Sequence, residues 1–148
     1  MLTVNGLLRS AADYVAALVR VTALEARYET ISFHLPVIDA GSGNKITGYL
    51  LGVKHGAGTI ISVDAHIVDA LVGSGGAGTI NCEIDGTNVT GGVVTMAIGS
   101  PTQGLRLAGS TVTAANAFTA SSVLDVEIAV GTAFTAGSVR LDIVILRS

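Results

Sequence analysis

The chain has few of the residues that carry chemistry, charge or cross-links in proteins. Of 148 residues, one is cysteine, two are proline, 4% are aromatic and 13% are charged. The single Cys82 excludes an intramolecular disulfide, and the flanking Ile80 and Ile84 indicate a thiol that faces a hydrophobic core. With 49% hydrophobic residues and so little charge, a monomer would expose apolar patches. We therefore expect much of the surface to be buried in an assembly.

The scarcity of charge also bears on nucleic acids and membranes as partners. The eight basic residues are scattered and the net charge is −3, so no basic patch for nucleic acid is indicated. The uncharged segment Gly86–Leu105 is interrupted by polar residues and glycines, and the apolar run Ala11–Leu24 is short and contains Asp13 and Arg20. A membrane-spanning helix needs about 20 predominantly apolar residues. Met1–Gly6 lacks the basic start of a signal peptide, so we expect synthesis in a cytosol.

A change of pattern near Glu29 divides the chain in two. Before it, apolar residues recur at spacings of three and four, which predicts an amphipathic helix that starts near Leu7 and is capped by Asn5. We call residues 1–28 the helical arm. The arm either covers its own domain or reaches a neighbouring subunit, and the second alternative makes its apolar residues candidate assembly contacts. These candidates are Leu8, Val15, Leu18, Val19 and Tyr28.

Residues 29–148 alternate between apolar and polar side chains with a period of two, in runs bounded by turn residues. About eight or nine short strands with no second helix predict a mainly β fold, a two-sheet antiparallel sandwich of jelly-roll type. The expected strands are Thr30–Pro36, Lys45–Lys54, Thr59–Val72, Thr79–Asp85, Val93–Ile98, Gly104–Ala108, Ser110–Thr113, Ser122–Val130 and Ser138–Arg147. The last two should pair as a hairpin that places Arg140 opposite Glu127.

The β body offers no catalytic constellation. The loop Gly73–Gly78 matches the dinucleotide pattern G-x-G-x-x-G, but the strand expected directly after it leaves no helix N-terminus for a pyrophosphate. Two strands could bring His34 and His66 together with Asp64 as a third metal ligand, although scattered histidines are the more ordinary outcome.

Asp125 and Glu127 share one face of an expected strand, an arrangement that resembles the paired carboxylates of a glycosidase. A single alternating strand beside a basic partner is more often a solvated surface. We therefore predict that the chain is not an enzyme and that it has no cofactor and no metal site.

The segment Ser122–Ser148, with its runs Val123–Ile128, Gly131–Gly137 and Val139–Leu141, resembles the Gly/Ala/Thr-rich jelly-roll proteins of tailed bacteriophage virions. The resemblance is to capsid decoration, or cement, proteins. It covers residues 29–148 and consists of the Gly/Ala/Thr-rich composition and the spacing of the strands. It implies a homo-oligomer, with a trimer favoured, that binds the major capsid protein and stabilises the head shell. It also implies a protein made in the bacterial cytoplasm and located on the capsid exterior.

A receptor- or glycan-binding module of a phage head or tail fibre is the alternative function. Such a module would present aromatic or polar side chains on loops, and Tyr49, Phe118 and Phe134 are the only aromatic residues after Phe33. An enzyme on a jelly-roll scaffold, such as a cupin, would need a histidine-rich metal cluster that the spacing does not provide. A decoration protein is therefore the predicted function.

Overall fold

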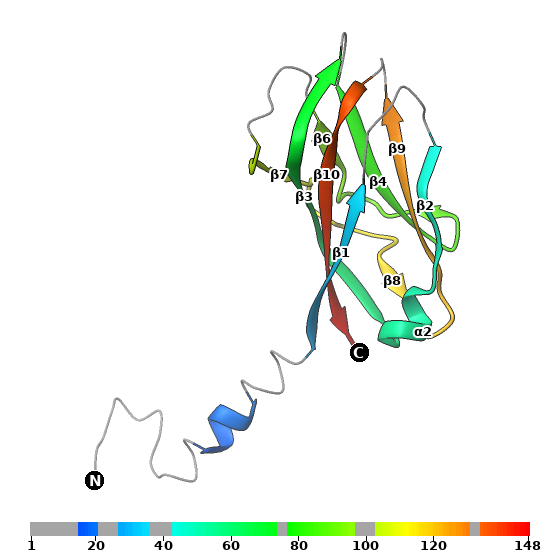
Figure 1. Ribbon diagram of the computed structural model, residues 1–148. Helices are drawn as coiled ribbons and strands as arrows, with labels where there is room; N and C mark the ends of the chain where they lie inside the picture. The colour runs from blue at the N-terminus through cyan, green and yellow to red at the C-terminus, as the bar shows by residue number, and fades with distance from the viewer. Residues whose placement is uncertain (1–14, 21–26, 36–42, 74–76, 97–102, 131–133) are drawn as a thin grey trace, which may run out of the picture.

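A computed structural model describes residues 15–20, 27–35, 43–73, 77–96, 103–130 and 134–148 of the chain. Residues 15–20 are helical, and the remaining described residues are mostly β (Figure 1). In chain order the elements are β1 (Tyr28–Leu35), β2 (Gly43–Tyr49), α2 (Leu51–His55), β3 (Gly58–Gly73), β4 (Gly78–Ile84), β5 (Thr87–Asn88), β6 (Val94–Met96), β7 (Arg106–Ala108), β8 (Ala117–Phe118), β9 (Leu124–Val130) and β10 (Phe134–Arg147).

The strands form two antiparallel sheets that face each other (Figure 1). The first sheet has the order β1-β10-β3-β7, with β8 also on β3, and the second has the order β2-β9-β4-β5, with β6 also on β4. The pairs are nested along the chain: β1 with β10, β2 with β9, β3 with β7 and β8, and β4 with β5 and β6. Such nested pairing arises when one long hairpin is wrapped into two facing sheets. This arrangement is a jelly roll. The predicted fold class is confirmed.

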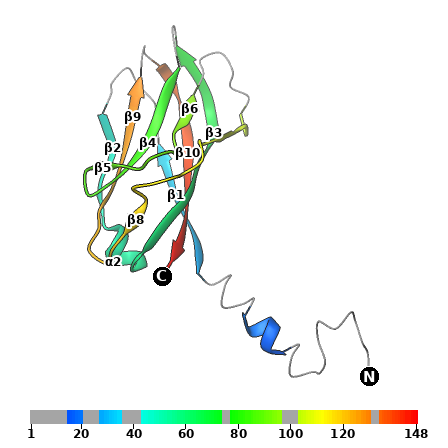
Figure 2. The same ribbon diagram turned by 180° about the vertical axis from the view of Figure 1, so that it is seen from behind.

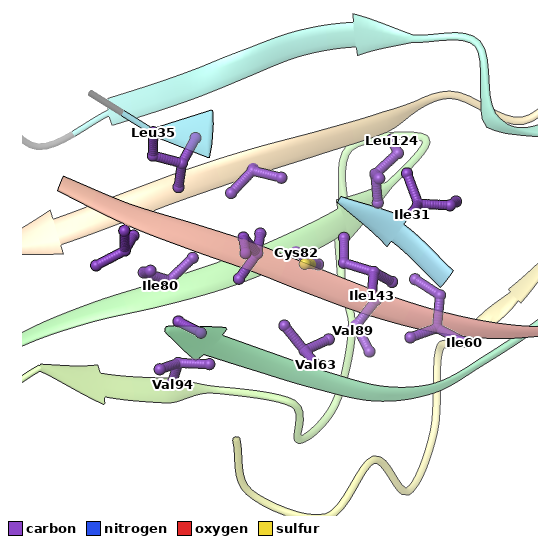
Figure 3. Packing of buried hydrophobic residues seen from close by; sticks show 14 of the residues in the cluster. Ile31, Leu35, Ile60, Val63, Ile80, Cys82, Val89, Val94, Leu124 and Ile143 are labelled. Carbon is purple, nitrogen blue, oxygen red and sulfur yellow. The ribbon is translucent and has the colours of Figure 1, made fainter. Parts of the chain in front are cut away.

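Alternate side chains of both sheets point into the space between them (Figure 3). In β4, buried and half-buried positions alternate along the whole strand, so Ile80, Cys82 and Ile84 lie in the core. Full burial of each aliphatic side chain contributes about 1.5–3 kcal/mol. Burial also raises the pKa of the Cys82 thiol to about 12. The predicted core-facing thiol is confirmed.

The strands β9 and β10 are consecutive in the chain but lie in different sheets. β9 pairs with β2 and β4, whereas β10 pairs with β1 and β3, so the predicted hairpin is wrong. The inward side chains of both strands follow from their alternation, which depends only on which face is buried. The buried residues of the two strands are Leu124, Val126, Ile128, Val139, Leu141, Ile143 and Ile145. They meet across the core instead of side by side.

A second helix interrupts the strand expected over Lys45–Lys54. The strand β2 ends at Tyr49, and the short helix α2 follows with Leu51 and Gly52 buried. The backbone N–H of Gly52 donates a hydrogen bond of 2.9 Å to the carbonyl of Ser122. A Cβ atom at position 52 would lie 2.0 Å from the Thr119 carbonyl oxygen, so only glycine permits this close approach. A contact with a segment so distant in sequence leaves no trace in local periodicity.

The expected strand Ser110–Thr113 is also absent, since residues 110–113 are all described and none is in a strand. The segment is held by irregular backbone bonds, such as that from the Thr113 N–H to the Thr90 carbonyl at 2.9 Å. Asp85 and Gly86 form the turn between β4 and β5, since both residues have positive φ and Ile84 pairs with Thr87.

Candidate interaction surface

Exposed apolar side chains gather at the end of the sandwich where β1 and β3 begin and β10 ends. Tyr28 opens β1, Leu50 precedes α2, Val53 lies within α2, and Ile61 lies near the start of β3. Their exposed fractions run from 42% for Ile61 to 67% for Val53. We call these four residues the arm-end patch. Only Tyr28 was among the predicted contacts, because Leu50 and Val53 fall in a segment whose pattern predicts a strand.

The exposure of Ile61 follows from a β-bulge. Ile145 of β10 pairs with Ile60, but the next residue, Val144, pairs with Ser62. Ile61 is therefore the extra residue on β3, and it turns outward next to Ser62. A period-two pattern cannot reveal a bulge, so no sequence signal pointed to this residue.

Part of the predicted helical arm lies within the described residues. Residues 15–20 are helical, and both ribbon views place them beyond the arm end, off both sheets (Figures 1 and 2). Val15, Leu18 and Val19 are each 54–62% exposed. Leu8, the remaining candidate contact, lies outside the described residues. The apolar side of the helix thus faces solvent next to the end that carries the arm-end patch.

A line of polar side chains connects β1, β2 and α2 at this end. In His55, Nδ1 lies 3.1 Å from Oε2 of Glu29, and Nε2 lies 2.8 Å from the hydroxyl oxygen of Tyr49. Both atoms of the first contact are buried, and neither makes a hydrogen bond among the described residues, so the contact is an electrostatic one. With the proton on Nδ1, this N–H faces the Glu29 carboxylate, and Nε2 accepts the hydrogen bond from the Tyr49 hydroxyl. The Tyr49 hydroxyl therefore occupies Nε2, and the Glu29 carboxylate lies beside Nδ1.

Aromatic and cationic contacts surround this line. Phe33 meets Tyr49 edge to face with the ring centroids 5.0 Å apart, and Nζ of Lys54 lies 4.7 Å from the centre of the Tyr49 ring. Burial raises the pKa of Tyr49, and the nearby Glu29 carboxylate raises it further. The phenol therefore keeps its proton for the hydrogen bond to His55. These contacts fix the positions of β2 and α2, between which Leu50 of the arm-end patch lies.

The outer face of the first sheet carries a row of basic side chains drawn from four strands. The register aligns His34 of β1, Arg140 of β10, His66 of β3 and Arg106 of β7. These residues are scattered in the sequence, and only the strand order brings them together. Because β10 lies between His34 and His66, the two histidines are not neighbours, in agreement with the scattered arrangement that was the more ordinary expectation.

A row of acidic side chains lies next to the basic row. Arg106 contacts Asp64 at 2.9 Å, and Arg140 donates to Oδ2 of Asp142 through Nε and Nη2 at 3.1 and 2.9 Å. The hydroxyl of Ser32 donates to the other oxygen of Asp142 at 2.6 Å. Burial raises the pKa of Asp142, but the hydrogen bonds from Ser32 and Arg140 outweigh it, so the pKa lies below its usual value. The arginines of this face thus form ion pairs with aspartates of the same face, which argues against its use as a basic patch for polyanions.

The carboxylates of Asp125 and Glu127 lie on the outer face of the second sheet. Asp125 accepts a hydrogen bond of 2.6 Å from the backbone N–H of Gly48, and Glu127 lies opposite Asn81 in the register. Arg140 lies on the outer face of the other sheet, so the predicted Arg140–Glu127 pair is wrong. Asp125 thus stabilises the end of β2.

Within the described part of the chain, no three His, Cys, Asp or Glu side chains form a group that could hold a metal ion. The same part contains no helix that is long and apolar enough to span a membrane. The glycine-rich loop is followed directly by β4, as predicted, so its dinucleotide pattern lacks the required helix.

The described residues thus define a jelly-roll sandwich in which four exposed apolar side chains lie at the arm end, while Val72 and Leu105 are exposed elsewhere. Comparison with protein-family models, curated proteins and solved structures found no match to this chain. The functional argument is therefore based on the fold and on the surface geometry.

Proposed function

We propose that the chain is a structural virion protein, a capsid decoration or cement protein. In this role it forms a homo-oligomer, with a trimer favoured, and stabilises the head shell by bridging major capsid protein subunits. It is made in the bacterial cytoplasm and located on the capsid exterior. The observation that carries the proposal is the arm-end patch, in which Tyr28, Leu50, Val53 and Ile61 are exposed where the arm meets the sandwich.

The arm-end patch is not part of the core that folds the sandwich. Apolar side chains that remain exposed together after folding are typical of a contact surface. Full burial of one such side chain contributes about 1.5–3 kcal/mol, whereas association costs about 4–15 kcal/mol. Four partly exposed residues therefore support only a marginal contact. The addition of Val15, Leu18 and Val19 from the arm makes the contact large enough to be stable, so arm and patch should act together.

Light scattering during gel filtration tests the self-association. We expect the full chain to elute at the mass of a discrete oligomer at micromolar concentration. A chain that lacks residues 1–26 keeps all of β1 and should elute as a monomer with an unchanged unfolding transition. A full chain that is monomeric would contradict the proposal.

A pair of substitutions separates a specific contact from general surface hydrophobicity. Val15→Asp combined with Val19→Asp should dissociate the oligomer, because both side chains would carry charge into the contact. Leu105→Asp is the matched control, since Leu105 is 40% exposed and its carbonyl bonds to Ile67, away from the arm end. Equal dissociation by both variants would show that the arm makes no specific contact.

Binding to viral shells tests the decoration role. Shells without the protein are mixed with it, sedimented and heated. We expect the full chain to sediment with the shells and to raise the temperature at which they open, and the chain without residues 1–26 to do neither. Self-association without shell binding would reject the decoration role.

A further inference from the structure

A hollow of about 320 Å³ lies between the β4–β5 turn and the segment that leads into β8. Its lining consists of Ile84, Asp85, Thr87, Ala115, Asn116 and Ala117. Sites for small molecules occupy about 300–1,000 Å³, so this volume fits one compact ring. The hollow shares no lining residue with the arm-end patch, and its lining has three polar and three apolar residues.

Two residues of the lining have left-handed backbone, Asp85 with φ 52° and Ala115 with φ 50°. The conformation of Asp85 is ordinary, because Asp85-Gly86 is the two-residue turn of a hairpin. Ala115 has no such local reason. Its neighbours hold it: Ala114 accepts a hydrogen bond from the Thr90 N–H, and Asn116 bonds twice to Ile60. Backbone strain maintained in this way clusters at ligand sites.

The polar side chains of the lining are oriented and retain free capacity. Oδ1 of Asp85 accepts the Val123 N–H at 2.8 Å, which fixes the carboxylate and leaves further lone pairs. The Val123 and Ser122 hydrogen bonds lower the pKa of Asp85, so it remains an acceptor at neutral pH. Asn116 uses one amide hydrogen on the Ile60 carbonyl at 2.8 Å, and its oxygen accepts no hydrogen bond among the described residues. The Thr87 hydroxyl likewise has no partner there.

The apolar part of the lining and the charge of the hollow define the ligand class. Ala115 and Ala117 are the exposed apolar residues of the lining and lie next to these acceptors and donors, whereas Ile84 is buried in the core beneath them. The lining contains no Lys, Arg or His for an anion, and Asp85 has no second carboxylate with which to hold a metal ion. A ring with several hydroxyl groups and an apolar face meets these conditions.

We propose that this hollow binds a single neutral sugar unit, with hydroxyl groups on Asp85, Thr87 and Asn116 and an apolar ring face on Ala115. The site adds a binding function to the proposed assembly role and does not rest on it. Without an aromatic side chain in the lining, one site should bind in the millimolar range. Several copies in one oligomer would then raise the affinity for a repeating glycan.

Amide chemical shifts measured during titration with neutral monosaccharides test the proposal. The panel is glucose, galactose, mannose and N-acetylglucosamine, with calcium as a separate arm. We expect at least one sugar to cause saturable shifts at residues 84–87 and 115–117. No saturable shift with any sugar, or shifts with calcium instead, would overturn the assignment. The chain without residues 1–26 should bind equally well, so loss of assembly and loss of sugar binding are distinguishable.

Three variants of the lining and one control variant test the contribution of individual residues to sugar binding. Thr87→Val and Asp85→Asn should each weaken binding roughly tenfold, because each removes a hydrogen-bonding group or charge while keeping the side-chain shape. Thr95→Val, at an exposed position on β6, should leave binding unchanged. Ala115→Gly should raise the melting temperature by relieving the backbone strain and should weaken binding by removing the methyl group. Sugar binding that none of the three lining variants alters would reject this site.

Discussion

The phenolic oxygen of Tyr49 lies 2.8 Å from Nε2 of His55, a contact that joins the end of β2 to the end of α2. His55 continues the line to Glu29 at the start of β1. Leu50 and Val53 lie between the two joined residues in the sequence, so their exposed positions depend on this contact. The polar line thus couples the stability of the sandwich to the shape of the surface that we propose for assembly.

Tyr49→Phe should lower the free energy of unfolding by about 0.5–1.5 kcal/mol, the usual net value of one hydrogen bond. The ring contacts with Phe33 and Lys54 remain, so only the hydroxyl is tested. Urea denaturation measures the change. Tyr28→Phe is the control, because the Tyr28 side chain is exposed, and it should have no effect. Equal stability of both variants would show that the Tyr49 hydroxyl contributes nothing.

Gly52→Ala should destabilise the fold by at least about 3 kcal/mol, because its Cβ would lie 2.0 Å from the Thr119 carbonyl oxygen. Gly56→Ala is the matched control in the same loop. Position 56 has open space around it, but its φ of 80° and ψ of −149° lie in a region that is essentially limited to glycine, so alanine there costs about 1–3 kcal/mol from backbone strain alone. Chemical denaturation of both variants provides the comparison. A smaller loss for Gly52→Ala than for Gly56→Ala would contradict the close approach of α2.

The strand positions and the inward residues were largely predictable, because alternation is a local property of the sequence. The strand expected over Thr79–Asp85 is observed over Gly78–Ile84. Strand pairing is not local. Both β9 and β10 alternate cleanly, and this alternation is the same whether two strands lie side by side in one sheet or face each other across a core.

The candidate surface was less predictable than the fold, for the same reason. Tyr28 was identified from the helical pattern, but α2 depends on the fit of Gly52 against Thr119, and the exposure of Ile61 depends on a bulge. The hollow at Ala115 requires a backbone conformation that alanine rarely adopts. Each of these features arises from a tertiary constraint that overrides local preference.

Asp142 should make stability fall in acid. Its pKa in the folded chain lies below the reference value of 3.8, although burial opposes this, because Ser32 and Arg140 stabilise the carboxylate. A lowered folded pKa means that the stabilisation is fully present above the unfolded pKa and is lost as the pH falls through the folded pKa. The free energies of unfolding of the native chain and Asp142→Asn should therefore differ at pH 6 and converge as the pH falls through the lowered pKa of Asp142.

The carboxyl resonance of Asp142 provides a second measurement of the same effect. Arg140→Gln removes two hydrogen bonds and a charge from the carboxylate, so the titration midpoint of Asp142 should move upward toward its usual value. A midpoint that does not move would assign the low pKa to Ser32 and His66 instead. Substitution of Arg147, which contacts Glu29 at the arm end, is the control and should leave the midpoint unchanged.

Cys82 should react with thiol reagents only when the sandwich opens. The thiol is 1% exposed on β4, and its pKa of about 12 leaves almost no thiolate at pH 8. Labelling should be slow in the native chain and should quicken with urea, about tenfold for each 1.4 kcal/mol of stability lost. The chain without residues 1–26 should label at the rate of the full chain when both are measured as monomers, because the helical residues 15–20 lie off both sheets. Faster labelling of the shortened chain would show that the arm stabilises its own sandwich and would weaken its assignment to contacts between copies.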